Sequence, residues 1–222
     1  MTVLLALLLA TRLRDNSFLV EEAYNQDPGV VQHIFSFTRE PAAWQWSFTQ
    51  EWPVGGQRHQ LSYTVPLTRD APLPAHVGDL ALNYRYQLLG GSEGAQLSCS
   101  PRLSVLLNAA GGAPFAQVLV PFSLVLSPSW ITHWNLGLSS ARAVTLGQSF
   151  IWSAAPFLEL LLEGVASGST QSIDAFTVSP GVRVALELPG ALQLVPGVAV
   201  PVDSHGRVGA LLYLSVEHPF LQ

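Results

Sequence analysis

The sequence contains little charge and no lysine. Only 11% of its 222 residues are charged, and all ten basic residues are arginine. A globular chain normally has about a quarter charged residues. A surface that binds nucleic acid needs clustered cations, whereas the net charge here is −5 and the arginines are scattered. We therefore expect no nucleic-acid partner.

Residues that commonly bind metals or form disulfides are also scarce. Cys99 is the single cysteine, so it can form neither an internal disulfide nor a zinc site, and we expect it to be inert. The six histidines have no spacing typical of a metal site. The glycine pairs lie between apolar segments and do not open helices, so they indicate turns and not phosphate loops. We expect no metal and no cofactor.

No segment is long and apolar enough for a membrane-spanning helix, which needs about 20 residues. Residues 1–14, "MTVLLALLLATRLR", contain only a short apolar run. They are similar to the hydrophobic part of a secretory signal peptide, and a buried first strand or helix is the alternative. We expect residues 15–30 to form a short periplasmic segment.

Alternation between apolar and polar residues is the main pattern of the chain. In "GDLALNYRYQLLG", residues 78–90, leucines and tyrosines alternate with Asp79, Asn83, Arg85 and Gln87. "WQWSFTQEW", residues 44–52, and "RVGALLYLSVEHPF", residues 207–220, alternate in the same way. A period of two places one set of side chains on each face of a β-strand.

Such segments of about ten residues recur to the end of the chain without a convincing helical interval, which is typical of a transmembrane β-barrel. Soluble sandwiches use shorter strands. The sequence predicts an all-β, antiparallel, up-and-down barrel over residues 31–222 in a bacterial outer membrane, with about twelve strands. We expect these strands near residues 31–39, 43–52, 58–67, 79–89, 102–109, 115–126, 130–138, 148–154, 157–166, 176–188, 191–202 and 207–217.

The connections and the prolines refine this prediction. Tight turns at 127–129, 154–156 and 189–191 alternate with longer connections at 139–147, 166–174 and 202–206, as expected for periplasmic turns and external loops. Residues 90–101 would be an unusually long periplasmic connection. Proline removes a ladder hydrogen bond, so we expect β-bulges at Pro121 and Pro196.

With the apolar side facing lipid, the polar side faces an enclosed lumen. Its charges have both signs, so they either line a polar pathway or close the lumen with ion pairs. The candidate lumen and ligand residues are Glu51, Asp79, Asn83, Arg85, Gln87, Arg102, His133, Asn135, Glu159, Glu163, Arg183, Glu187 and Glu217.

Tryptophan and tyrosine fall on the opposite, lipid-facing side. Such rings settle at the level of the lipid headgroups, and packing in a protein core is the alternative. The candidate membrane-interface aromatic residues are Trp44, Trp46, Trp52, Tyr84, Tyr86, Trp130 and Trp134.

His133 and Asn135 raise the question of catalysis, because some outer-membrane lipases use Ser, His and an Asn or acidic partner. Both residues are predicted to point into the lumen, whereas a phospholipid hydrolase needs a nucleophile that lipid can reach. No serine stands in a recognisable nucleophile motif such as G-x-S-x-G. We expect no enzymatic activity.

Several motifs carry a resemblance to a known family. "VGDLALNYRYQLLG" resembles a strand of the outer-membrane transporters assigned to phenol degradation, which are relatives by fold of long-chain fatty-acid and aromatic-hydrocarbon channels. "PRLSVLLNAAGG", "PSWITHWNLG", "LELLLEG" and "VSPGVRVAL...LVPGVAVPV" follow in the order that family shows, over residues 78–220. The resemblance implies a barrel in the outer membrane; the chain is short for the family and its loops are small.

These observations lead to one expected function and two alternatives. We expect passive passage or binding of small apolar or aromatic compounds in the lumen of an outer-membrane barrel. The alternatives are a non-enzymatic structural or assembly barrel closed by ion pairs, and a soluble lipocalin-like binder. The expected partners are the lipid bilayer, the barrel-assembly machinery during insertion, and a small apolar or aromatic ligand.

Overall fold

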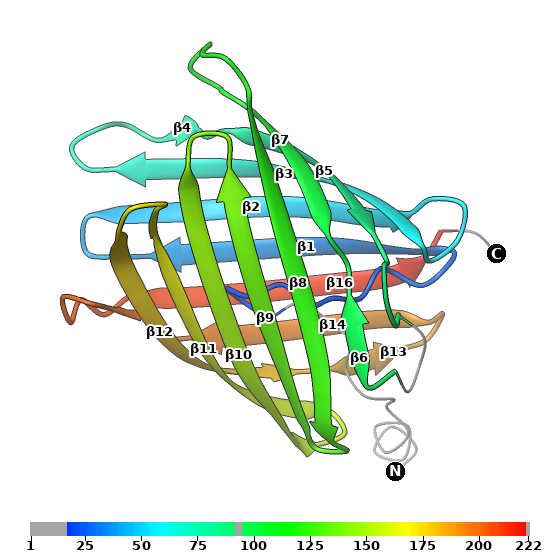
Figure 1. Cartoon of the computed structure of the whole chain (residues 1–222). Coiled ribbons are helices and arrows are strands. Elements are labelled where there is room, and N and C mark those ends of the chain that lie inside the picture. Colours follow the sequence, from blue (N-terminus) through cyan, green and yellow to red (C-terminus); the bar gives the residue numbers. More distant parts are fainter. Residues whose placement is uncertain (1–16, 92–94, 221–222) are drawn as a thin grey trace.

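The chain forms a closed, all-β barrel with twelve antiparallel wall strands, as predicted (Figure 1). In the computed structural model, which describes residues 17–91 and 95–220, β14 pairs with both β16 and β12 and thereby closes the wall. The wall strands are β1 (Val30–Arg39), β2 (Ala43–Pro53), β3 (His59–Asp70), β5 (Leu80–Tyr86), β7 (Arg102–Leu107), β8 (Phe115–Ser127), β9 (Trp130–Ser139), β10 (Ala143–Ala155), β11 (Leu158–Ser169), β12 (Ile173–Val184), β14 (Leu192–Ala199) and β16 (Ala210–Pro219).

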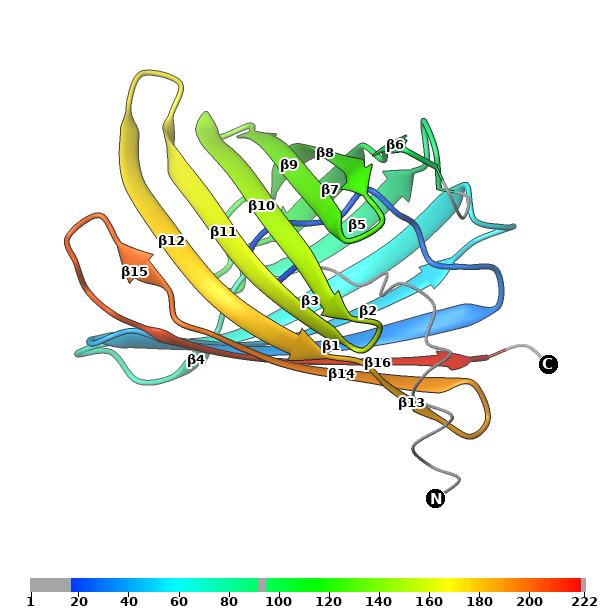
Figure 2. The ribbon, with the colours of Figure 1, turned by 90° about the horizontal axis from the view of Figure 1, so that it is seen from below.

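Four short strands continue the wall where a long strand stops. They are β4 (His76–Val77), β6 (Leu97–Cys99), β13 (Leu186–Leu188) and β15 (Val202–Asp203). Each pairs with a long neighbour: β4 with β3, β6 with β8, β13 with β14 and β15 with β12. Figures 1 and 2 show the strands of the two opposite walls crossing steeply, as tilted barrel strands do.

The alternating sequence produces two unlike surfaces. Along β9, exposed and buried residues alternate from Trp134 to Ser139, so that Trp134, Leu136 and Leu138 are about half exposed while Asn135 is buried. The same alternation runs from Ala210 to Ser215 in β16. The outer face is therefore a broad apolar band, and the interior is rich in Ser, Gln, Asn, Glu and Arg. This inside-out distribution is that of a barrel surrounded by lipid.

Four prolines inside wall strands occupy the same kind of position. Pro66, Pro121, Pro180 and Pro196 each lie opposite the break between a long strand and the short strand that continues its line. A residue opposite such a break has no ladder partner for its N–H on that side. Proline, which has no N–H, therefore removes no ladder hydrogen bond there. The prediction of bulges at Pro121 and Pro196 is wrong, because the register passes through both without a shift.

Two connections are shorter than predicted. β10 begins at Ala143 and β12 at Ile173, which leaves turns of three residues at 140–142 and 170–172. The polar residues next to these turns, such as Thr145 and Ser167, belong to the strands, because they pair in the ladder between β10 and β11. The predicted long connection at 90–101 contains β6, which pairs with β8 and so belongs to the wall.

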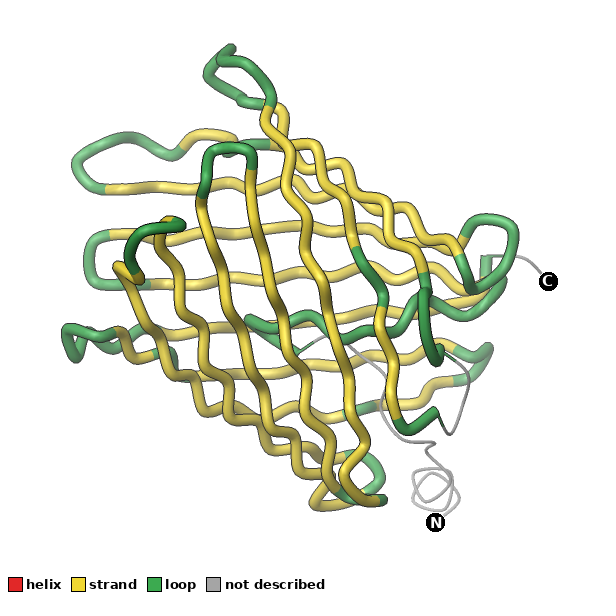
Figure 3. Tube along the Cα trace, viewed as in Figure 1, coloured by secondary structure: helices red, strands yellow, loops and turns green. Residues whose placement is uncertain are grey.

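The segment before β1 lies inside the barrel. In Figure 3 the loop that precedes β1 runs between the walls, and Val20, Ala23 and Asn25 are buried. Residues 15–30 were expected to form a separate periplasmic segment, whereas residues 17–26 lie inside the barrel. The predicted signal segment at 1–14 lies outside the described residues. Within the described part of the chain, no helix has the length and apolarity to cross a membrane.

Candidate functional site

Residues 17–26, here called the plug, fill the middle of the lumen. The plug contacts side chains from β3, β5, β8, β9 and β11, on opposite sides of the barrel. It has no strand pairing of its own among the described residues, so its buried peptide groups must find other partners. Inward-pointing side chains of the wall supply them.

Several backbone N–H groups of the plug donate hydrogen bonds to side-chain oxygens of the wall. The Oε1 atom of Glu163 accepts hydrogen bonds from the N–H groups of Leu19 and Val20, at 3.0 and 3.1 Å. Ser123 Oγ accepts from the N–H of Ala23 at 2.8 Å. At the last residue of the plug, the N–H of Gln26 donates to Gln60 Oε1 at 2.7 Å. Glu163 and Ser123 are both at most 1% exposed, so these bonds are shielded from water.

Two wall amides bind the plug as a neighbouring strand would. Asn135 Oδ1 accepts from the N–H of Glu21 while Asn135 Nδ2 donates to the carbonyl of Glu21, both at 2.7 Å. Gln87 Oε1 accepts from the N–H of Asn25 at 2.9 Å, and its Nε2 donates to the carbonyl of Ala23 at 2.8 Å. Each amide thus satisfies one donor and one acceptor of the plug backbone.

The plug also carries the counter-ion of two lumen arginines. Glu21 forms ion pairs with Arg85, at 2.5 Å, and with Arg102. Arg85 additionally donates to the carbonyl of Tyr24 at 3.1 Å. Removing the plug would leave both arginines without this carboxylate in the lumen, so the charge distribution favours the filled state.

A second buried ion pair joins two neighbouring strands of the wall. Arg183 on β12 and Glu159 on β11 pair at 2.8 Å, and their side chains are 1% and 3% exposed. Ser153 donates a further hydrogen bond to Glu159 at 3.0 Å. This pair joins neighbouring wall strands, because Arg183 and Glu159 are direct cross-strand partners.

A cavity of about 310 Å³ remains between the plug and the inner faces of β1 and β2. Phe18, Ile34, Leu211 and Tyr213 form an apolar side, and the rings of Phe18 and Tyr213 lie 5.1 Å apart. The polar part of the lining includes Ser47, Thr49, Thr64 and Asn83 and the charged residues Glu21, Glu51 and Arg102. A second hollow of about 410 Å³ shares Thr64, Asn83 and Arg102 with it. The free lumen is therefore amphipathic.

Most of the predicted lumen residues are buried in the barrel interior. Glu51, Asn83, Arg85, Gln87, His133, Asn135, Glu159, Glu163 and Arg183 are all at most 8% exposed. Arg102, Asp79 and Glu217 are half-buried, and Arg102 and Asp79 line the larger hollow. Glu187 differs, because it is exposed on β13 and pairs there with Gln193.

The predicted interface aromatics lie on the outer face. Tyr84, Trp130 and Trp134 are at least 40% exposed. Trp44, Trp46, Trp52 and Tyr86 are partly covered by neighbours, such as Phe37 against Trp44 and Tyr63 against Trp52. Sequence analysis missed Trp152, whose ring stacks on Trp130 at 6.0 Å.

A buried serine–histidine pair lies beside the plug. Ser123 Oγ and His133 Nδ1 are 2.6 Å apart, which is the spacing of a nucleophile and its base. Both side chains are at most 1% exposed, and Ser123 Oγ already accepts the N–H of Ala23. In this state the pair binds the plug and is closed to substrate; absence of enzymatic activity stays a prediction. Among the described residues no group of His, Cys, Asp and Glu has the geometry of a metal site.

Comparisons with known proteins relate the fold to outer-membrane barrels. No family profile and no curated protein sequence matches the chain. Solved structures do match: the KdgM porin has a TM-score of 0.61 and 9% identity, covering 86% of this chain and 99% of that one. An outer membrane channel from Pseudomonas putida F1 has a TM-score of 0.61 and 11% identity, covering 94% and 100%.

The NanC porin is also similar, with a TM-score of 0.60 and 6% identity over 86% of this chain and 100% of that one. At such low identity the likeness concerns the fold and does not single out one family, so the resemblance to phenol-degradation transporters stays a prediction. The fold is that of bacterial outer-membrane β-barrels, which supports the predicted location in the outer membrane.

Proposed function

We propose that this chain is a passive outer-membrane channel that its own plug closes, and that small compounds pass when the plug shifts. The observation that carries this proposal is how the plug is attached. The hydrogen bonds described between plug and wall use side chains of the wall, and the wall ladder is closed without the plug. The plug can therefore move without breaking the barrel.

The amphipathic cavity supports the class of solute. Phe18 and Tyr213 offer ring surfaces, while Thr49, Thr64 and Asn83 offer polar groups in the same cavity. A small aromatic compound with hydroxyl substituents would use both kinds of contact. The proposal thus keeps the aromatic solutes expected from the sequence and adds a polar substituent.

The second candidate function is a structural barrel whose lumen stays filled. The buried Arg183–Glu159 pair and the Glu21–Arg85–Arg102 cluster favour it, because paired charges inside a barrel hold the strands together without any passage. In that case no solute passes through the barrel, and the plug fills the lumen permanently.

Currents across planar bilayers that contain the purified barrel separate the two functions. The channel predicts discrete openings, which catechol blocks more strongly than glucose. Tyr213→Leu should weaken the catechol block, whereas Tyr86→Leu, a matched change on the outer face, should leave it intact. A barrel that passes no current, even after the plug contacts are weakened, would establish the structural function instead.

A further inference from the structure

Two arginines and a tryptophan form a row across the outer face of the barrel. Arg39 on β1 lies opposite Trp44 on β2, and Trp44 lies opposite Arg69 on β3. Their neighbours Thr38, Gln45 and Thr68 line the lumen, so these three side chains point outward. Two strand spacings separate the arginine backbones by about 10 Å.

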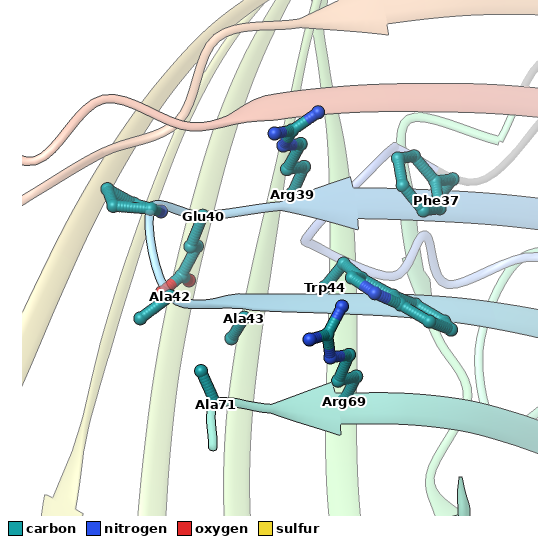
Figure 4. A pocket seen from close by; sticks show the side chains of 9 residues that line it. Phe37, Arg39, Glu40, Ala42, Ala43, Trp44, Arg69 and Ala71 are labelled. Carbon is teal, nitrogen blue, oxygen red and sulfur yellow. The ribbon is translucent and has the colours of Figure 1, made fainter. Parts of the chain in front are cut away.

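The row borders a hollow of about 490 Å³ beside the turn between β1 and β2 (Figure 4), at the opposite end of the barrel from the start of β1. Phe37 and Trp44 form its apolar part, and the turn after β1 forms its rim. Backbone hydrogen bonds fix that rim: the N–H of Glu40 donates to the carbonyl of Ala43 at 2.8 Å, and the N–H of Ala71 to that of Ala42 at 2.9 Å. The shape of the hollow is therefore held by backbone hydrogen bonds of the turn.

No described carboxylate forms an ion pair with the arginines of this row. In residues 17–91 and 95–220, neither Arg39 nor Arg69 has a carboxylate within ion-pair distance, whereas Arg207 at the same end pairs with Asp203 at 2.6 Å. Glu40 is the one acidic side chain in the hollow, and Figure 4 shows its carboxylate near Ala42, on the turn. Arg39 and Arg69 are both exposed.

The position of these cations relative to the apolar band points to a ligand. An arginine on the lipid-facing side is costly at mid-membrane and is tolerated near the interface, where anionic headgroups lie. Arg39 is the last residue of β1 and Arg69 is one residue from the end of β3. Guanidinium groups bind phosphate oxygens through paired N–H donors, and an aromatic ring beside them suits the start of an acyl chain.

We propose that Arg39, Trp44 and Arg69 form a binding site for the phosphate of an anionic lipid in the surrounding bilayer. The two guanidinium groups bind the phosphate, and Phe37 and Trp44 contact the adjoining apolar part of the lipid. A lipid is favoured over soluble phosphate because the apolar part of the hollow continues into the lipid-facing band, where Leu67 and Trp46 follow in register.

Native mass spectrometry of the folded barrel in detergent tests this site with two probes. Phosphatidic acid and diacylglycerol with the same acyl chains differ only in the phosphate. We expect tighter binding of phosphatidic acid, weakened about fivefold by R39Q or R69Q and about 25-fold by both. The matched control is R58Q, which removes an exposed charge at the opposite end. Heat-modifiable migration on a denaturing gel shows that each variant is folded.

Three results would overturn the proposal: equal binding of the two probes, an equal loss in R58Q, or unchanged binding in the double variant. A further arm adds glycerol phosphate, which has no acyl chain. If it displaces phosphatidic acid at equal concentration, the site recognises soluble phosphate and the assignment to lipid is wrong. If it does not, the apolar contacts are part of recognition, as proposed.

Discussion

The side-chain amide of Asn135 exchanges two hydrogen bonds, each of 2.7 Å, with the backbone of Glu21. A wall residue thereby does for the plug what an adjacent strand would do. Gln87 repeats the pattern with Ala23 and Asn25. The plug is held by side chains that a substitution can remove one at a time, and this makes its role accessible to experiment.

Replacing Asn135 with leucine should loosen the plug. The substitution leaves the N–H and the carbonyl of Glu21 without their partner, and each unsatisfied buried group costs about 1–3 kcal/mol. We expect more frequent channel openings and faster hydrogen exchange in peptides that cover residues 17–26. Gln148→Leu makes the same chemical change on the outer face, on the strand next to β9, and should alter neither readout. Equal behaviour of the two variants would show that Asn135 does not hold the plug.

Glu163 offers a test of the other end of the plug. Its Oε1 atom accepts two backbone N–H groups, so Glu163→Ala should leave both without an acceptor inside the barrel, at a cost of about 1–3 kcal/mol each. Glu163→Gln keeps an acceptor oxygen and should have the smaller effect. Hydrogen exchange at Leu19 and Val20 measures both. Unchanged protection in the alanine variant would contradict the described contacts.

The pair of Arg183 and Glu159 should behave differently, because it joins two wall strands. Removing one partner breaks a buried ion pair, so Arg183→Met or Glu159→Gln alone should destabilise the barrel by about 3–5 kcal/mol. The double variant should lose less than the sum of the two single losses, since the two side chains interact directly. Urea unfolding in detergent micelles gives the free energies for this double-mutant cycle. Additive losses would mean that the two side chains do not interact.

The wall of the barrel could be predicted from the sequence, because its pattern is local. Leu82, Tyr84 and their polar neighbours alternate with a period of two, and this alternation defines both the strand and its lipid-facing side. The strand bounds at residues 143 and 173 were missed, since Thr and Ser there extend strands that end in polar turns. The site of each internal proline depends on a break in a neighbouring strand, which no local pattern reveals.

The plug could not be predicted in the same way. Residues 17–26 have no strand-like alternation, and their partners Gln87, Asn135 and Glu163 are 62 to 144 residues away in sequence. The available signal was indirect: several amides and carboxylates on the inward side of the strands need hydrogen-bond partners in a lumen. A polar stretch directly before the first strand, "EEAYNQD", is able to supply them.

A disulfide between the plug and the wall tests the central claim most directly. Ser17 Oγ and Ser149 Oγ are 3.4 Å apart, so S17C and S149C, combined with C99A, place two sulfurs within reach of a bond. Single-channel recording should show no openings in the oxidised protein and restored openings after reduction, while either single cysteine variant stays unaffected by oxidation. Currents that persist unchanged in the oxidised protein would contradict closure by the plug.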